Sequence, residues 1–275
     1  FFTNMGQVYR TKAYELPEGG RDAKGQHVAN QLAFRPDETI AQVMAISSYA
    51  DDDYLVLATR DGLVKKTPLS AYDSPRQAGV IAINLRQDEH GEPDELVSAV
   101  IASADDDLML VSRNGMSLRF HASDGALRPM GRSTSGVRGM KFREGDKLLA
   151  MDVVKPDADL LVVTEGGYAK RTPLEEYRVQ GRGGFGVKVA DVSEDRGALV
   201  GALVTEPEEE VMAIMESGNV IRVSVSDVRP TGRTTKGVIL ARTGEHDAVS
   251  AITRSSDTQV GSDGKDDSDK ENADA

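Results

Sequence analysis

The chain has 275 residues, of which 39% are hydrophobic, and a formal net charge of −12 at pH 7. It contains no cysteine, which excludes disulfides and thiolate metal sites and fits a protein of the reducing cytoplasm. No apolar run reaches the roughly 18 residues of a membrane span, the first residues carry no signal-peptide pattern, and the four histidines share no metal-ligand spacing.

A turn-like tripeptide recurs five times along the chain and sets the period of a repeat. The tripeptides are residues 4–6, 60–62, 113–115, 165–167 and 216–218, and their final glycines lie 56, 53, 52 and 51 residues apart. Asp-Gly and Asn-Gly between apolar runs are strong hairpin signals, because glycine supplies the positive φ of a type I′ turn. Each tripeptide therefore predicts a tight hairpin of this type.

Each unit is predicted to hold four strands: one before the turn, one after it, a third opened by a second glycine, and an apolar closing strand. In the first unit the second strand is predicted at 8–10 and the closing strand at 40–46. In the other four units the first, second and closing strands are predicted, in chain order, at 54–59, 63–66 and 96–102; at 107–112, 117–119 and 148–154; at 159–164, 168–171 and 199–205; and at 210–215, 220–222 and 248–252. The third strands follow Gly25, Gly79, Gly136, Gly186 and Gly237. Only residues 1–2 remain of the first unit's opening strand, so we expect the sequence to begin inside a unit.

Short strands repeated in this way are typical of the blades of a propeller-like ring. We predict an all-β fold of five four-stranded blades, the first truncated, within a domain at 1–254. The repeats are expected at about 1–50, 51–103, 104–155, 156–205 and 206–254. Residues 255–275 hold seven acids and two lysines and almost no apolar residue, which predicts a disordered acidic tail.

Basic residues recur at fixed offsets from the two glycines of each unit. One base lies four residues after every turn glycine: Arg10, Lys66, Arg119, Arg171 and Arg222. A second lies three or four residues before every second glycine: Arg21, Arg76, Arg132, Arg182 and Arg233. Further bases lie close to these positions: Lys24, Arg128, Arg138, Lys170, Arg178, Lys188, Arg229 and Lys236.

If the units close into a ring, equivalent positions fall on one continuous band. A band of cations suits the phosphates of a bent duplex, so these bases predict a double-stranded-DNA-binding rim. Glycine-rich connections would add backbone N–H contacts to phosphate, and the lack of an aromatic stripe disfavours single-strand binding. Lysine and arginine on strand edges also protect sheets from aggregation, but that role does not explain the fixed offsets.

Residues 1–254 resemble the C-terminal domain of the bacterial DNA gyrase A protein, and in particular its actinobacterial members. The most telling segment is 167–187. Its core is similar to the family's heptapeptide Gln-Arg-Arg-Gly-Gly-Lys-Gly and consists of Gln180, Gly181, Arg182, Gly183, Gly184, Phe185 and Gly186. Gly181 and Phe185 replace two bases of that pattern, and the family's best-known copy lies in a first blade that this sequence lacks. Residues 180–186 are therefore interpreted as a degenerate copy in a later blade.

The resemblance implies a β-pinwheel, in which neighbouring blades exchange strands and duplex DNA bends around the outer rim. It also implies a cytoplasmic assembly of two A and two B subunits, which uses ATP and Mg²⁺ to introduce negative supercoils. The DNA-cleaving tyrosine of that family lies in the N-terminal part of the gyrase A protein, so none of the seven tyrosines here is expected to be catalytic. No metal or cofactor is expected in this domain. The acidic tail either competes with DNA for the rim or only keeps the protein in solution.

Three alternative functions compete with this interpretation. Residues 181–186 also satisfy the dinucleotide fingerprint G-x-G-x-x-G, but that site needs a strand before it and a helix after it. The related C-terminal domain of topoisomerase IV bends DNA but lacks the box. A protein-binding propeller would expose aromatic hot spots, whereas only 5% of these residues are aromatic and none is tryptophan.

Overall fold

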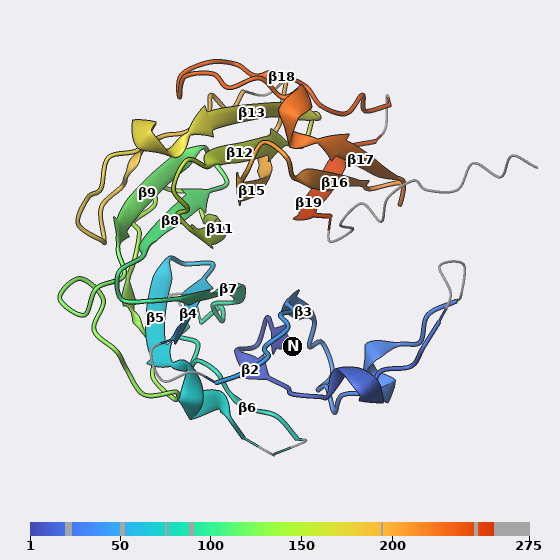
Figure 1. Ribbon diagram of the computed structural model, residues 1–275, viewed down its shortest axis with the longest axis vertical. Helices are drawn as coiled ribbons and strands as arrows, with labels where there is room; N and C mark the ends of the chain where they lie inside the picture. The colour runs from blue at the N-terminus through green and yellow to red at the C-terminus, as the bar shows by residue number, and fades with distance from the viewer. Residues whose placement is uncertain are drawn as a thin grey trace, which may run out of the picture.

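The computed structural model describes residues 1–19, 24–49, 53–74, 76, 78–87, 91–193, 195–244 and 247–255. Its strands form five small antiparallel sheets that follow one another around a central axis (Figure 1). Helical structure in these ranges is limited to short 3-10 turns at Ala13–Glu15, Val28–Asn30, Leu69–Tyr72, Leu174–Glu176 and Val225–Asp227. The predicted all-β propeller of five blades is confirmed, although within the described residues the first sheet has four strands and the fifth has three. The predicted acidic tail lies outside the described residues except for Ser255.

The sheets are ordered from the central axis outward, with the closing strand of each unit innermost. The first contains β3 (Ile40–Gln42), β1 (Phe2–Thr3), β2 (Gln7–Val8) and β6 (Val80–Ile81), and the second contains β7 (Leu96–Ala102), β4 (Tyr54–Thr59), β5 (Leu63–Pro68) and β10 (Val137–Arg138). The third contains β11 (Leu148–Val153), β8 (Asp107–Ser112), β9 (Met116–His121) and β14 (Val187–Lys188). The fourth contains β15 (Leu199–Thr205), β12 (Asp159–Thr164), β13 (Tyr168–Pro173) and β18 (Val238–Ile239), and the fifth contains β19 (Val249–Arg254), β16 (Glu210–Met215) and β17 (Val220–Ser224).

The outermost strand of each of the first four sheets is donated by the next unit along the chain. For example, β10 follows β9 of the third unit but pairs with β5 of the second, with Val137 opposite Val64. The same exchange places β6, β14 and β18 on the first, third and fourth sheets. The predicted third strand of the first unit is not observed, because residues 24–27 form no strand.

The predicted hairpins are present, but their turns are not of type I′. A type I′ turn needs positive φ at both central residues, whereas Asp61 and Asn114 are absent from the positive-φ residues of the described chain. Only the glycine of each turn is left-handed, with φ of 82° at Gly62 and 80° at Gly115. The amide of Gly62 donates to the carbonyl of Thr59 at 2.9 Å, which gives a three-residue loop with a glycine bulge.

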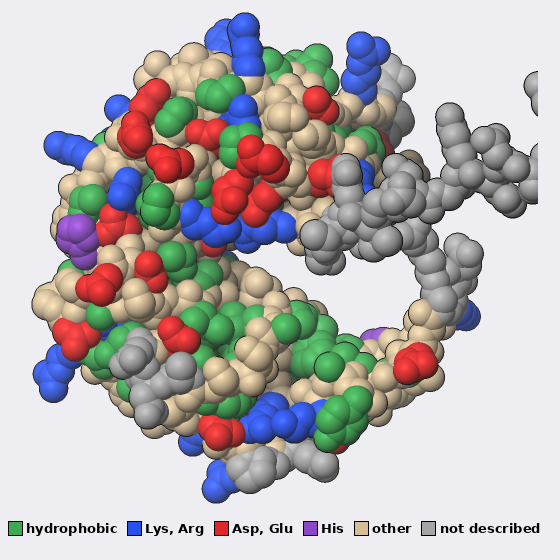
Figure 2. All heavy atoms as spheres, viewed as in Figure 1, with side chains coloured by type: hydrophobic (Ala, Val, Ile, Leu, Met, Phe, Trp, Pro, Cys, Tyr) green, Lys and Arg blue, Asp and Glu red, His purple; other side chains and the backbone are tan. Residues whose placement is uncertain are grey.

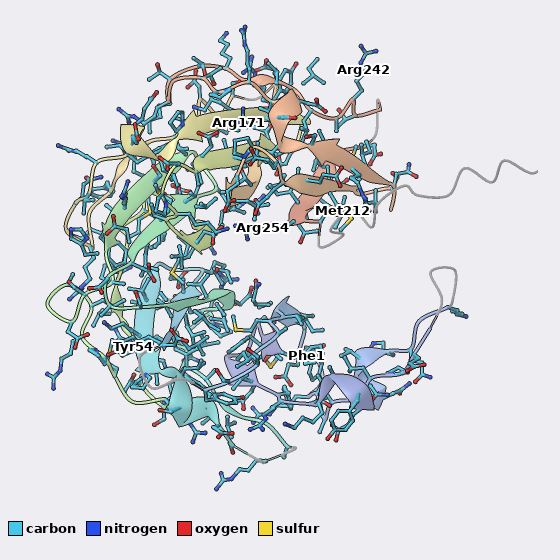
Figure 3. The ribbon with its side chains drawn as sticks, in the orientation of Figure 1. Phe1, Tyr54, Arg171, Met212, Arg242 and Arg254 are labelled. Carbon is cyan, nitrogen blue, oxygen red and sulfur yellow. The ribbon has the colours of Figure 1, made fainter. Side chains whose placement is uncertain are left out.

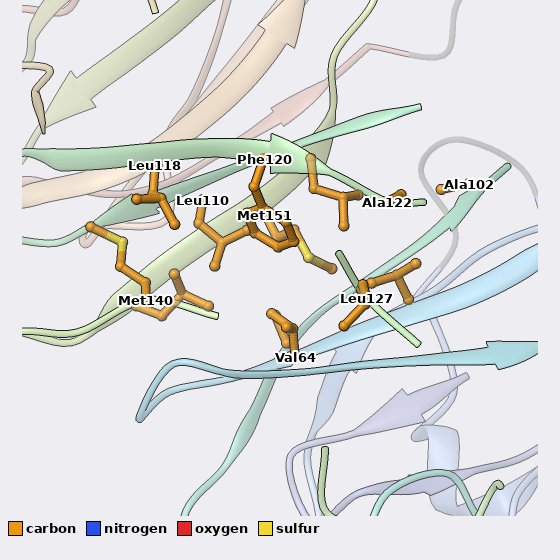
Figure 4. Close-up of a cluster of buried hydrophobic side chains, with 13 residues drawn as sticks. Val64, Ala102, Leu110, Leu118, Phe120, Ala122, Leu127, Met140 and Met151 are labelled. Atoms are coloured by element: carbon orange, nitrogen blue, oxygen red, sulfur yellow. The ribbon is translucent and has the colours of Figure 1, made fainter. Parts of the chain in front are cut away.

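The core lies between successive sheets, so the central strands are buried on both faces. In β8, Leu108 and Leu110 join the cluster shared with the second sheet, while Met109 and Val111 join the cluster shared with the fourth. Figure 4 shows the first of these clusters, in which Phe120 is 0% exposed. Burial of both faces explains why these strands are continuous apolar runs rather than alternating ones.

The innermost strands pack side by side around the axis. Residues of β3, β7, β11, β15 and β19 line a central cavity of about 180 Å³. Figure 3 shows Arg254 at the inner side of the arc, where its guanidinium donates to the carbonyl of Val204 at 2.7 Å and forms an ion pair with Asp152 of β11. The chain thus closes each blade at the axis and crosses to the preceding blade at the outer edge.

Candidate nucleic-acid interface

Four connections lead from the second strand of one blade to the outermost strand of the preceding blade. These crossing connections are residues 69–79, 122–136, 174–186 and 225–237. They run along the outer edge of the propeller (Figure 1). Each of the last three is fixed by one backbone bond to the strand beneath it: Met130 N to Lys66 O, Gln180 N to Arg119 O, and Thr231 N to Arg171 O, all at 2.8 Å.

The crossing connections present exposed cations at equivalent positions. Arg128, Arg178 and Arg229 each lie eight residues before the second glycine of their unit, and all three are exposed. No ion pair within the described part of the chain involves them. Figure 2 shows lysine and arginine side chains projecting from the outer edge of the molecule. Unpaired arginines therefore recur at one position of three connections, which also carry the exposed acids Asp124, Glu175 and Asp227.

The predicted bases just before the second glycine also belong to this edge. Arg76 and Arg182 are exposed, whereas Arg132 and Arg233 are partly buried. Arg21 lies outside the described residues. The remaining predicted connection and strand-end bases that are exposed are Lys24, Arg138, Lys188 and Lys236.

Two of these arginines also bond to the outermost strand of a neighbouring sheet, and Arg182 bonds to the neighbouring connection as well. Arg182 donates from Nε to the carbonyl of Ala126 at 2.7 Å and from Nη1 to the carbonyl of Arg138 at 3.0 Å. Arg233 donates from Nη1 to the equivalent carbonyl, that of Lys188, at 3.2 Å. These bonds use part of each guanidinium, and the exposed remainder of Arg182 is available to a phosphate.

The bases four residues after the turn glycine do not form the exposed band that their spacing predicts. Lys66 is 0% exposed and Arg171 is 5% exposed, because the next unit's connection covers their strands. Lys66 donates to the carbonyl of Ala122 and to Asp124 Oδ1, both at 2.6 Å, and lies 4.4 Å from the ring centre of Tyr54. The expected exposure of Lys66 and Arg171 is therefore wrong, and their charge is used inside the protein.

The other three members of this set are paired with carboxylates. Arg119 donates to Asp107 Oδ2 at 2.8 Å and to the carbonyl of Leu174 at 3.1 Å. Arg10 is exposed and forms an ion pair with Asp73. Arg222 is also exposed, and its Nη1 forms an ion pair with Glu210 Oε2 at 3.4 Å.

The acids at the start of the central strands explain this pairing. Asp107, Asp159 and Glu210 open β8, β12 and β16, and each pairs with the base on the neighbouring strand: Arg119, Arg171 and Arg222. Burial raises the pKa of Asp159, and the nearby Arg171 opposes that rise. Cross-strand pairs of this kind stabilise a sheet, so the fixed offset of these bases reflects the blade's own structure.

Lys170 is also buried, in contrast to the sequence-based expectation, and it has a counterpart that the pattern of bases did not reveal. Lys65 and Lys170 each lie three residues after a turn glycine and are 0% and 3% exposed. Burial lowers the pKa of Lys65 to about 7 and that of Lys170 to about 8. The sequence does carry a signal for these two lysines, because two consecutive bases, at 65–66 and 170–171, occur at this place in the second and fourth units only.

The box-like loop at 180–186 forms the middle of one crossing connection. Its amides at Gln180 and Gly183 donate to the carbonyls of Arg119 and Gly139, at 2.8 and 2.5 Å, so these two N–H groups are not available to phosphate. Gly186 has φ of 74°, and a Cβ there would lie 2.0 Å from the carbonyl oxygen of Ser117. The strand β14 follows directly and no helix does, which excludes the dinucleotide site.

These observations define the chain as a β-propeller with exchanged outer strands and an outer edge of repeated cations. The family model described as DNA gyrase C-terminal domain, beta-propeller, matches residues 1–47, 53–103, 106–155, 158–206 and 209–256. The chain therefore belongs to the DNA gyrase C-terminal domain family, and the resemblance inferred from its sequence is confirmed.

The curated relatives are DNA gyrase A subunits. The chain is 62% identical to that of Streptomyces coelicolor over 94% of its own length, and 56% identical to that of Mycolicibacterium smegmatis over 100%. It spans only 30% and 32% of those relatives' lengths. The expected likeness to actinobacterial members is confirmed. No helix in the described ranges is long and apolar enough to cross a membrane.

Solved structures show the same fold. The C-terminal domain of DNA topoisomerase IV has a TM-score of 0.81 at 27% identity, over 92% of this chain and 77% of that one. A DNA gyrase A C-terminal domain has a TM-score of 0.78 at 25% identity, over 92% and 80%. The fold alone does not separate the two enzymes, whereas the sequence relatives favour gyrase.

Proposed function

We propose that this chain binds duplex DNA along the outer edge of the propeller and bends it, and thereby supports ATP-dependent negative supercoiling by DNA gyrase. The observation that carries the proposal is the repetition of exposed, unpaired arginines at equivalent positions of successive crossing connections: Arg128, Arg178 and Arg229. A duplex presents phosphates at a regular pitch, so a row of cations at the pitch of the blades suits it.

Bending requires contacts at several blades together. Smooth bending of a 20–30 bp site costs about 1–6 kcal/mol, more than one exposed ion pair contributes. Cations on three successive connections, with Arg182, Arg138 and Lys188 beside them, spread the attraction along the arc. In this proposal the domain needs no cofactor or metal. The ATP- and Mg²⁺-dependent steps and the DNA-cleaving tyrosine belong to the other parts of an enzyme of two A and two B subunits, located in the cytoplasm.

Salt dependence of duplex binding tests the proposal. If about five phosphates are neutralised, log K falls with log salt with a slope near −4.5. The triple variant Arg128→Ala/Arg178→Ala/Arg229→Ala is expected to make this slope shallower by about 0.9 for each arginine, or about 2.7 in all. A wild-type slope near zero contradicts DNA binding through phosphates.

A matched control removes the same charge elsewhere. Arg113, Lys147 and Lys155 are exposed and lie outside the crossing connections. The triple variant Arg113→Ala/Lys147→Ala/Lys155→Ala has the same net charge as the test variant and is expected to keep the wild-type slope. Equal losses in the two variants mean that net charge, not the outer edge, governs binding.

A topology assay with the complete A and B subunits separates gyrase from topoisomerase IV. The test-variant enzyme is expected to lose negative supercoiling of relaxed plasmid while it keeps relaxation of supercoiled plasmid. Wild-type enzyme that only relaxes or decatenates DNA supports the topoisomerase IV assignment instead.

A further inference from the structure

Two buried lysines lie directly beneath the candidate DNA-binding edge. Lys65 on β5 and Lys170 on β13 occupy equivalent positions in the second and fourth blades. The same position in the third blade is Leu118, which is also fully buried. A buried ammonium group is costly unless it is hydrogen-bonded, so its partners indicate why it is present.

Each ammonium group donates to two carbonyls. One carbonyl lies in a crossing connection, and the other lies just after the outermost strand of the preceding sheet. Lys65 Nζ donates to the carbonyls of Ala82 and Arg132. Ala82 follows the outermost strand of the first sheet, while Arg132 belongs to the connection of the third unit. One lysine therefore ties together chain segments that serve three consecutive blades.

Lys170 makes the same pair of bonds two blades further along. Its Nζ donates to the carbonyls of Val189 and Arg233. Val189 follows the outermost strand of the third sheet, and Arg233 belongs to the connection of the fifth unit. Arg132 and Arg233 are equivalent members of the predicted DNA-binding set. Each buried lysine therefore holds the backbone carbonyl of the arginine at this equivalent position of its own covering connection.

We propose that Lys65 and Lys170 are positioning residues for Arg132 and Arg233, and that each takes up a proton when a phosphate binds the arginine that it holds. The inference rests on the proposed function, because the bound phosphate is that of duplex DNA.

The charged surroundings of each lysine support the coupling to phosphate. Burial is the largest cause of the lowered pKa of Lys65, and the positive charge of Arg132 lowers it further. The Tyr72 hydroxyl also donates to the Ala82 carbonyl, at 3.0 Å, so this carbonyl accepts from both Tyr72 and Lys65. For Lys170 burial is again the largest cause of its lowered pKa, Glu176 opposes it, and Arg233 and Lys188 add to it. A phosphate that neutralises Arg132 or Arg233 removes the repulsion that helps to hold these pKa values near about 7 and 8.

The experiment compares the wild-type chain with Lys65→Met/Lys170→Met, which keeps side-chain length and removes both ammonium groups. The control is Leu118→Met, an apolar exchange at the equivalent position of the third blade. Titration calorimetry with a duplex in two buffers of different ionisation enthalpy measures protons taken up on binding. Salt titrations give the number of phosphates neutralised.

Wild type and Leu118→Met are expected to take up protons near pH 8, and the double variant is not. The double variant is also expected to have a salt slope shallower by about 0.9 for each displaced arginine. If wild type binds the duplex without proton uptake, and the double variant keeps the wild-type slope, the positioning proposal is overturned while DNA binding stands. If wild type does not bind the duplex, the proposed function fails first and the inference falls with it.

A second measurement decides the question even if the double variant does not fold. Carbon-13 NMR of the lysine Cε groups of the wild type follows the titration of Lys65 and Lys170 with and without duplex. Their pKa values are expected to rise when DNA is bound, because phosphate offsets the charge of the neighbouring arginine. Titration curves that do not move overturn the proposal.

Discussion

Replacement of Arg171 by methionine separates a structural cation from a binding one. The Arg171 side chain is 6% exposed, and its partner Asp159 is 11% exposed. Removal of one partner from a buried pair leaves an uncompensated charge and costs about 3–5 kcal/mol. The matched variant Arg178→Met changes an exposed arginine of the same blade and is expected to alter stability by less than about 0.5 kcal/mol.

The cost of Arg171→Met also depends on pH. Without Arg171, the pKa of Asp159 is raised further above its unfolded value, because burial then acts without an opposing charge. Below the pKa that Asp159 has in the unfolded chain, this carboxyl is protonated in both the folded and the unfolded state. At neutral pH, the folded state must either bury the Asp159 carboxylate or keep it protonated, whereas the unfolded state releases that proton. The destabilisation is therefore largest near pH 7 and shrinks on acidification towards pH 4.

Urea unfolding followed by circular dichroism at pH 7 and near pH 4 measures both effects. Duplex titrations under native conditions give the complementary result: Arg178→Met makes the salt slope shallower by about 0.9, and Arg171→Met leaves it unchanged. The reasoning is refuted if Arg171→Met retains wild-type stability and loses DNA affinity, because Arg171 would then be reaching phosphate rather than Asp159.

Two further predictions concern the buried lysines and the turn glycines. Wild-type stability is expected to rise from about pH 7 towards pH 10, because unfolded lysine holds its proton up to its ordinary pKa of 10.5 while folded Lys65 and Lys170 release theirs near about 7 and 8. Thermal unfolding of Lys65→Met/Lys170→Met should lack this rise, and an equal slope in both proteins contradicts the assignment. Gly115→Ala should lower the free energy of unfolding more than Gly218→Ala. Both glycines have positive φ, but a Cβ at Gly115 would lie 2.7 Å from the carbonyl oxygen of Ala190, whereas a Cβ at Gly218 would have nothing within 4 Å. The Gly218 change should cost about 1–2 kcal/mol in urea unfolding, and equal costs would count against the packing argument.

The central strands of the later units could be predicted from the sequence with little error, whereas in the first unit the predicted third strand is not observed and the closing strand covers only Ile40–Gln42 instead of 40–46. The predicted ranges 54–59, 107–112 and 159–164 coincide with β4, β8 and β12. Short apolar runs between turn signals specify such strands locally, and burial on both faces keeps every residue of the run apolar. The prediction of type I′ turns was wrong. Asp-Gly and Asn-Gly suit both a two-residue loop and a three-residue loop with a bulge, and only the pairing register of the two strands distinguishes these loops.

The sequence by itself determined the number of blades, the order of most strands along the chain and the recurrence of bases at fixed offsets, but not which sheet each outermost strand joins. Only the tertiary structure decided which of those bases meet solvent. Lys66 and Arg171 follow the same spacing rule as exposed Arg10, yet each is covered by a connection that begins more than 50 residues further along the chain. Burial of a side chain depends on what the exchange of strands brings over it, and no local pattern around Lys66 records the position of residues 122–136. The arginines at 128, 178 and 229 of the crossing connections therefore stay exposed to solvent, whereas Lys66 and Arg171 beneath such connections do not.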